Sequence, residues 1–180
     1  KFVVLSFSES QTRGGFISVL DAFTKAFDGQ DDVALVLKDR ATTDRFREVV
    51  DHYSSAHDVE IILDDRDLTD FEEQNQLYSN ADLMLYLNYS STFAMTAMQS
   101  LSCGLPLCSM SYSGPAEYLT DYNGLKIEYN LCEVSDELLN KLQGFGLRNY
   151  LFPRSYFHVS PVWAIPLVSD VIKQLKFAYE

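Results

Sequence analysis

The chain lacks the features that define several large classes of protein. Its 180 residues contain no apolar run approaching the roughly 20 residues of a membrane-spanning helix. Positive charge is scarce, since 14 lysines and arginines stand against 26 acidic residues for a net charge of -12. This balance argues against nucleic acid and anionic membrane as non-specific partners, although a local basic site for a phosphate remains compatible with it. Walker, dinucleotide-glycine and nucleophile-elbow patterns are also missing.

Cysteine and histidine are few, with three residues of each. Cys103, Cys108 and Cys132 lack the spacing of a metal site, and the apolar neighbours of the first two predict reduced core thiols in a cytosolic protein. The acidic run at residues 64–70 lacks the glycine and the terminal glutamate of a calcium loop. We therefore expect no metal ion and no cofactor.

What the sequence does contain is an alternation of apolar runs of strand length with helical patterns. Hydrophobic residues make up 47% of the chain, which is enough for a sizeable core. The alternation predicts an α/β fold, a doubly wound, Rossmann-like parallel sheet of about six strands with helices on both faces. The predicted strands are residues 2–7, 33–37, 59–63, 83–87, 107–110 and 125–129. The clearest predicted helices are residues 16–27, 42–54, 69–79, 134–142 and 166–179.

Two details of these helices can be read from single residues. Thr69 and Glu72 fit a capping box at the start of the third helix, whose Phe71 and Leu77 are expected to face the core. Ser135 is a plausible cap for the helix at residues 134–142.

The stretch from Ser90 to Pro106 organises the rest of the chain. It contains a helix rich in small residues, which allow close packing against a sheet or a ligand. Gly104 suits a left-handed C-terminal cap, and no helix continues through Pro106. Because apolar strands flank this stretch, it forms a strand-loop-helix-strand unit. The loop of such a unit opens at the carboxyl edge of the sheet, where open α/β sheets usually bind ligands.

A second candidate ligand loop follows the first predicted strand. Arg13, Gly14 and Gly15 lie at the start of the first helix, where free N–H groups and the helix dipole favour a phosphate. An ordinary turn with a solvated arginine is an equally good interpretation. Lys38 follows the second strand and would point toward the same edge, although a solvated loop lysine is the slightly better interpretation.

These motifs together resemble the C-terminal, nucleotide-sugar-binding half of glycosyltransferases with the GT-B architecture, in particular the retaining enzymes of family 4 (group 1). That family has a glutamate, a small residue and Phe-Gly, then a second glutamate and Ala-Met-Ala-Cys-Gly-x-Pro. Phe93 and the segment 103–106 match this signature, whereas Ser91 and Gln99 replace the two glutamates. The resemblance covers about residues 1–130.

The resemblance implies a role for each matching residue. Arg13, helped by Lys38, would stabilise the departing diphosphate. Gly15 matches a family glycine, and Gly14 occupies the place of a family lysine. Ser91 would lie near the donor sugar, which makes Arg13, Lys38 and Ser91 the predicted catalytic residues.

The remaining predicted site residues would bind the nucleotide sugar without acting on it. Gln99 would hold the ribose, because its amide still offers an acceptor and two donors. Gly114 and Glu117 match the family's Gly-x-x-Glu segment, and Glu117 is expected to hold its loop. The backbone expected beside the sugar is that of Thr92, Phe93 and Ala94.

The resemblance also bears on the organisation of the protein. We expect residues 1–180 to form a single domain, with an irregular aromatic segment and a terminal helix within residues 145–180 that crosses to an N-terminal domain. Because the chain does not begin with Met, we expect a fragment whose partner is the acceptor-binding N-terminal domain of the same full-length protein. The expected location is cytoplasmic, and peripheral attachment to a membrane through that missing domain stays open.

Three functions are compatible with these observations. The first is the donor-binding domain of a metal-independent retaining glycosyltransferase, inactive on its own, that moves a hexosyl group from a nucleotide-diphosphate sugar to a glycan or other acceptor. Polysaccharide biosynthesis is a typical setting for it. The second is a catalytically inactive glycosyltransferase-like binding or scaffold module, which the loss of both glutamates favours. The third is an unrelated doubly wound ligand-binding domain.

Overall fold

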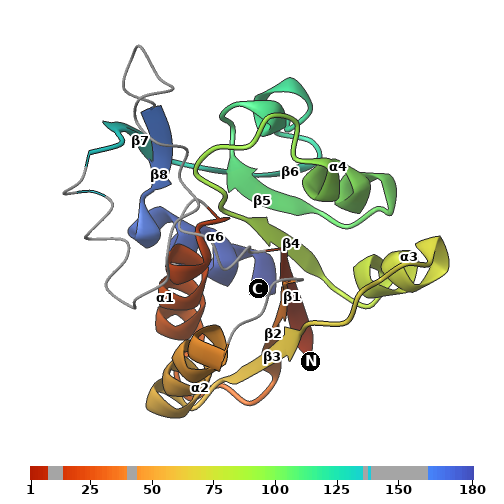
Figure 1. Cartoon of the computed structure of the whole chain (residues 1–180), viewed down its shortest axis with the longest axis vertical. Coiled ribbons are helices and arrows are strands. Elements are labelled where there is room, and N and C mark those ends of the chain that lie inside the picture. Colours follow the sequence, from red (N-terminus) through yellow and green to blue (C-terminus); the bar gives the residue numbers. More distant parts are fainter. Residues whose placement is uncertain (8–13, 40–43, 136–137, 139–161) are drawn as a thin grey trace.

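The computed structural model describes residues 1–7, 14–39, 44–135, 138 and 162–180. Figure 1 shows a central sheet with helices on either side of it and a small second sheet apart from it. The helices and strands are, in chain order, β1 (Phe2–Phe7), α1 (Phe16–Phe27), β2 (Val33–Lys38), α2 (Asp44–His57), β3 (Glu60–Asp64), α3 (Phe71–Ser79), β4 (Leu83–Tyr86), α4 (Met95–Ser102), β5 (Leu107–Met110), η2 (Gly114–Glu117), β6 (Gly124–Ile127), β7 (Tyr129–Glu133), β8 (Val162–Pro166) and α6 (Val168–Tyr179).

The main sheet has six strands in the order β3-β2-β1-β4-β5-β6. Every pairing in it is parallel, for example Val4 of β1 with Leu35 of β2 and Leu5 of β1 with Met84 of β4. The chain builds outward from β1 through β2 and β3 and then returns to the other side of β1 with β4. The strand order therefore reverses between β1 and β4, where open sheets of this kind bind their ligands. The predicted doubly wound parallel sheet is confirmed.

The sheet is covered on both faces, which explains the continuous apolar strands in the sequence. Helices α1, α2 and α6 lie on one side, and α3 and α4 on the other (Figure 1). Neighbouring residues of one strand point to opposite cores, so Val4 belongs to the core under α1, α2 and α6, whereas Leu5 belongs to the core that includes Tyr78 of α3 and Ala97 of α4.

The start of α3 differs from the prediction by one residue. Asp70, not Thr69, is the N-cap, and its carboxylate accepts a hydrogen bond from the Glu72 backbone N–H at 3.0 Å. Phe71 then becomes the first helical residue and is 72% exposed, so the expectation that it faces the core is wrong. Leu77 is half-buried, and the fully buried side chain of this helix is its neighbour Tyr78.

The end of α4 agrees with the sequence. Gly104 follows the helix with φ +78, and its backbone N–H donates to the carbonyl of Leu101. Only a residue without a side chain adopts this left-handed conformation freely.

Two strands of the structure lie outside the predicted set. β7 and β8 form an antiparallel pair in which Leu131 lies opposite Ala164. The predicted irregular segment and most of the predicted helix at residues 134–142 fall on residues 136–137 and 139–161, outside the described part of the chain. At the start of that helix, Ser135 Oγ accepts a hydrogen bond from the Leu138 N–H at 3.1 Å, as expected of a cap.

The terminal helix α6 packs against the same domain. Val171 and Leu175 are fully buried beside α1, and the Tyr179 hydroxyl donates to the Asp32 carboxylate at 2.6 Å. The opposite side of α6 is open, and Phe177 there is 67% exposed. Crossing of this helix to another domain stays a prediction. Among the helices that the structure describes, none has both the length and the apolar character of a membrane span.

The three cysteines are all free thiols, but their surroundings differ. Cys108 on β5 is fully buried, as expected of a core thiol, and burial raises its pKa. Cys103 is exposed, so the expectation that it is a core thiol is wrong. It is the C-cap of α4, where the chain turns at the surface. Cys132 is half-buried in β7. Within the described ranges, no three histidine, cysteine or acidic side chains come together as a metal site.

Candidate functional site

Two helices begin at the carboxyl edge of the sheet beside the β1–β4 switch point. The N-caps are Gly15 for α1 (φ 69) and Ala94 for α4 (φ 58), and among the described residues neither helix start has a side-chain capping hydrogen bond. The first N–H groups of a helix have no partner within it, and together with the helix dipole they attract anions. Two uncapped helix starts on adjacent loops therefore form a surface suited to a group carrying several negative charges.

The two glycines directly before α1 lie close to the segment that follows β4. Gly14 and Gly15 are both buried, and a Cβ at Gly15 would lie 2.1 Å from the carbonyl oxygen of Leu87. In the first turn of α1, Ser18 Oγ lies 2.8 Å from the hydroxyl of the buried Tyr89. These contacts fix the start of α1 relative to β4, as a shared ligand site requires.

The loop between β4 and α4 is hydrogen-bonded to the start of η2 and to the residue before it. The Ser91 carbonyl accepts hydrogen bonds from Ser113 Oγ at 2.6 Å and from the Gly114 N–H at 3.3 Å. Gly114 is buried so closely that a Cβ there would lie 2.5 Å from both Cα and the carbonyl carbon of Phe93. The structure thus brings Ser91, Phe93 and Gly114 together, as the sequence predicts for one site.

The other residues of these two segments differ in accessibility. Ala94 is buried, Thr92 is exposed and Phe93 is 43% exposed, so the tip of the loop is open to solvent. Glu117 at the end of η2 is exposed, and its side chain forms no hydrogen bond or ion pair with the described residues. No contact of the Glu117 side chain with described residues therefore supports its expected role of holding the loop. The hydroxyl of Tyr118 contacts the loop before α4 instead, since it lies 3.1 Å from both Phe93 O and Ala94 O.

Gln99 lies one turn further along α4, half-buried beside α3. Its Oε1 is 3.3 Å from the hydroxyl of Tyr78, which also lies 3.2 Å from the carbonyl oxygen of Thr96. Burial raises the pKa of Tyr78, which keeps this hydroxyl neutral. The side chain of Gln99 is thus oriented by a neighbouring helix, and a role at the ribose stays a prediction.

Lys38 is enclosed by the end of β3. Only 3% exposed, it donates from Nζ to the backbone carbonyls of Asp64, at 3.1 Å, and Arg66, and it lies 3.5 Å from the Asp64 carboxylate. The interpretation of Lys38 as a solvated loop lysine is therefore wrong. Hydrogen bonds from the Arg66 guanidinium, at 2.6 and 3.0 Å, hold the pKa of Asp64 below its ordinary value, which burial alone would raise. In this arrangement Lys38 ties β2 to the loop after β3.

The predicted site residues therefore fall into three groups. The first lies around the β1–β4 edge and comprises Gly14, Gly15, Ser91, Thr92, Phe93, Ala94, Gly114 and Glu117. Gln99 and Lys38 lie further out and are already bonded to neighbouring elements. Arg13 lies outside the described residues. Sequence reasoning misses Ser18, Tyr89 and Tyr118 as residues that support the site. For the two tyrosines, an aromatic residue close after a strand or a candidate loop is a pattern that could indicate such a role.

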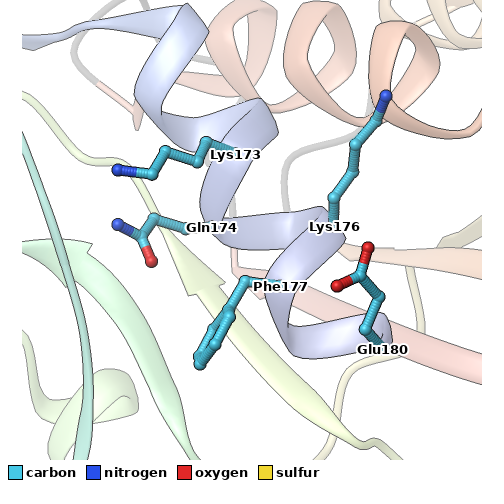
Figure 2. A pocket seen from close by; sticks show the side chains of 5 residues that line it. All are labelled: Lys173, Gln174, Lys176, Phe177 and Glu180. Atoms are coloured by element: carbon cyan, nitrogen blue, oxygen red, sulfur yellow. The ribbon is translucent and has the colours of Figure 1, made fainter.

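Two hollows formed by described residues lie away from this edge. One is on the outer side of α6 (Figure 2), lined by Lys173, Gln174, Lys176, Phe177 and Glu180. The ring of Tyr179, next to these residues, contacts Phe2 at the amino end of β1, so this hollow lies toward the edge opposite the candidate site. Another lies between α1 and α2 and is lined by Asp21, His52, Tyr53, Ala56 and His57. No predicted site residue lines either of them.

Solved structures of glycosyltransferases share this architecture. The C-terminal domain of a group 1 glycosyl transferase, LpcC from Francisella tularensis, matches with a TM-score of 0.61 and 16% identity over 99% of this chain and 84% of that one. The pneumococcal O-GlcNAc transferase GtfA in complex with UDP and GlcNAc matches with a TM-score of 0.55 and 18% identity over 80% of this chain and 27% of that one. The catalytic domain of cholesterol-α-glucosyltransferase from Helicobacter pylori gives a TM-score of 0.55 and 12% identity over 69% of this chain and 76% of that one.

At these identities the structural likeness shows the fold alone. The comparison with curated proteins finds no match. The model of the family "Glycosyl transferases group 1" matches residues 1–143, which include the whole six-stranded sheet and both helix starts at its carboxyl edge. With the sheet order and the signature around Phe93, this match shows that the chain belongs to the group 1 glycosyl transferases.

Proposed function

We propose that the chain binds a nucleotide-diphosphate sugar at the carboxyl edge of β1 and β4, as the donor domain of a glycosyltransferase that transfers a hexosyl group to a glycan or other acceptor. The observation that carries this proposal is the pair of uncapped helix starts at Gly15 and Ala94 on adjoining loops. A diphosphate placed there would receive backbone N–H groups and the positive ends of two helix dipoles.

The chemistry assigned to this edge is stabilisation of a departing diphosphate. Donors fixed before the reaction stabilise developing charge without having to reorganise during it. The tight contact of Gly15 with Leu87 and the support of Ser91 by Ser113 supply that rigidity. Arg13, next to Gly14 in the sequence, would add a guanidinium that can make two parallel hydrogen bonds to a phosphate.

Lys38 and Ser91 receive narrower roles than the resemblance implies. Because the Lys38 ammonium group is enclosed by Asp64 and Arg66, we assign Lys38 to holding the loop after β3 rather than to the diphosphate. Ser91 offers a neutral hydroxyl near the sugar, which can hydrogen-bond but cannot provide the stabilisation of a carboxylate.

The activity of the whole protein goes beyond this domain. The chain spans 27% of GtfA, the UDP-bound relative, so the acceptor site is assigned to an N-terminal domain, and this chain alone is expected to transfer nothing. A cytoplasmic location follows as part of the same proposal. An inactive glycosyltransferase-like binding module is the second candidate, and the neutral residues Ser91 and Gln99 are the observation that favours it.

Titration calorimetry with UDP, GDP and UDP-glucose tests the proposal. We expect micromolar binding of at least one of them, weakened by about 10- to 100-fold in Arg13→Ala, because a hydrogen bond to a charged group contributes roughly 1.5–3 kcal/mol. Arg45→Ala is the matched control, since Arg45 lies on α2 in an exposed ion pair with Glu48. Absence of binding by all three nucleotides would overturn the proposal, and an equal loss in both variants would exclude Arg13 as a specific ligand.

A further inference from the structure

The loop between β4 and α4 is held in a conformation that it would not adopt by itself. Ala94 has φ 58 and ψ 58, in the left-handed region that is unfavourable for a residue with a side chain. Ser113, which contacts this loop, has φ 55 and ψ −131, a conformation that favours glycine. Two non-glycine residues in disfavoured conformations persist only where the surroundings hold them firmly. The question is which group supplies that hold.

Tyr118 is placed to hold the loop before α4 in this conformation. Its hydroxyl lies 3.1 Å from both Phe93 O and Ala94 O, the last two carbonyl groups before α4 begins. Its ring meets the ring of Phe93 edge-on, with centroids 5.8 Å apart. Burial raises the pKa of Tyr118 to about 12, so the hydroxyl keeps its proton at neutral pH. The same residue thus contacts the loop through its hydroxyl and through its ring.

These contacts act on the part of the loop that determines where the helix N-terminus points. The Ala94 carbonyl also accepts from the N–H groups of Ala97 and Met98, at 3.0 and 3.1 Å, and so forms the first turn of α4. Rotation of the peptide after Ala94 would redirect the free N–H groups of that turn. A contact with Ala94 O therefore controls the donors that the proposed diphosphate site needs.

We propose that Tyr118 is a positioning residue, which holds Phe93 and Ala94 so that the first turn of α4 points at the ligand edge. This inference rests on the proposed function, and it names a residue outside the predicted site. Tyr118 does not touch the ligand in this proposal. It raises the fraction of molecules whose loop is ready to bind, and the apparent affinity follows that fraction.

Tyr118→Phe tests the inference, because it removes the hydroxyl and keeps the ring against Phe93. We expect affinity for UDP and UDP-glucose to fall about three- to tenfold, the equivalent of one net hydrogen bond. Tyr112→Phe is the matched control, since the Tyr112 hydroxyl donates to the carbonyl of Val162 at 3.3 Å, away from this loop. Unchanged affinity in Tyr118→Phe would overturn the inference.

A second variant separates positioning from general stability. Ala94→Gly removes the cost of the left-handed conformation, so in that background Tyr118→Phe is expected to weaken nucleotide binding less than twofold. A merely structural role would give the same loss in both backgrounds, and that outcome would contradict positioning through Ala94.

Amide hydrogen exchange gives a readout that needs no ligand. In Tyr118→Phe we expect faster exchange of the Ala97 and Met98 amides, whose hydrogen bonds end on Ala94 O, and unchanged exchange in β1 and β2. If the unmodified chain binds no nucleotide, the proposed function fails, while these amides still decide whether Tyr118 holds the loop. Unchanged exchange at both amides would refute the positioning role by itself.

Discussion

Gly15→Ala provides a direct test of how tightly the start of α1 is fixed against β4. Gly15 has φ +69, and a Cβ there would lie 2.1 Å from the Leu87 carbonyl oxygen, far inside the 3.0 Å below which such contacts are essentially never seen. The conformation costs an alanine roughly 1–2 kcal/mol, and the forced displacement of backbone roughly 1–3 kcal/mol more. We therefore expect a total destabilisation of about 2–5 kcal/mol.

A second glycine separates the two contributions. Gly29 has φ +71 and no heavy atom within 4 Å of the Cβ position, so Gly29→Ala should carry only the cost of the conformation. Thermal unfolding, followed by circular dichroism, measures both variants against the unmodified chain. For a chain of this size, each kcal/mol lowers the melting temperature by about 2–4 °C, so the additional effect at Gly15 is readily resolved. Equal losses at Gly15 and Gly29 would refute the close packing of the α1 start against β4.

Two further predictions concern single polar residues. Asp70→Ala should lower the free energy of unfolding by about 1 kcal/mol through loss of the α3 cap, and Thr69→Ala should be nearly neutral; the reverse order in urea denaturation would restore Thr69 as the cap. Asp64 should make stability acid-sensitive, because Arg66 lowers its pKa in the folded state. The contribution of Asp64 to the free energy of unfolding is complete above about pH 4, the ordinary pKa range of an aspartate, and is lost as the pH falls through its lowered pKa in the folded state. Asp64→Asn should therefore be less stable than the unmodified chain at neutral pH, and this difference in stability should shrink on acidification. Stability curves that stay parallel between about pH 7 and pH 3 would contradict this account.

Most of the fold could be predicted from the sequence, because the strands of a buried parallel sheet have a simple hydrophobic pattern. Strands covered on both faces are continuous apolar runs, and α1 repeats its apolar residues with helical spacing. β7 and β8 could not be found in the same way. Their pairing joins Tyr129 to Pro166, residues far apart in the sequence, and no short turn signal connects them. The pairing of β7 with β8 depends on long-range contacts that local patterns do not encode.

The candidate site was predictable in outline and less so in detail. Glycines that permit a close approach, such as Gly15 and Gly114, stand out in a sequence, and the structure gives each a backbone neighbour that excludes a side chain. The orientation of a long side chain is not encoded locally. Lys38 ends a strand at the predicted edge, yet its ammonium group bonds to Asp64, a residue of a different strand. Which neighbour a lysine finds depends on the sheet order.

The packing of α6 on α1 has a consequence for how the protein is made. The ring of Tyr179 contacts the rings of Phe2 and Phe27, so helix α6 covers aromatic residues that are synthesised well before it. At ordinary rates of synthesis, these early residues wait for their cover on the order of ten seconds or more. During that interval the nascent chain exposes an aromatic surface to the cell, and a chaperone that binds apolar segments would find its target there.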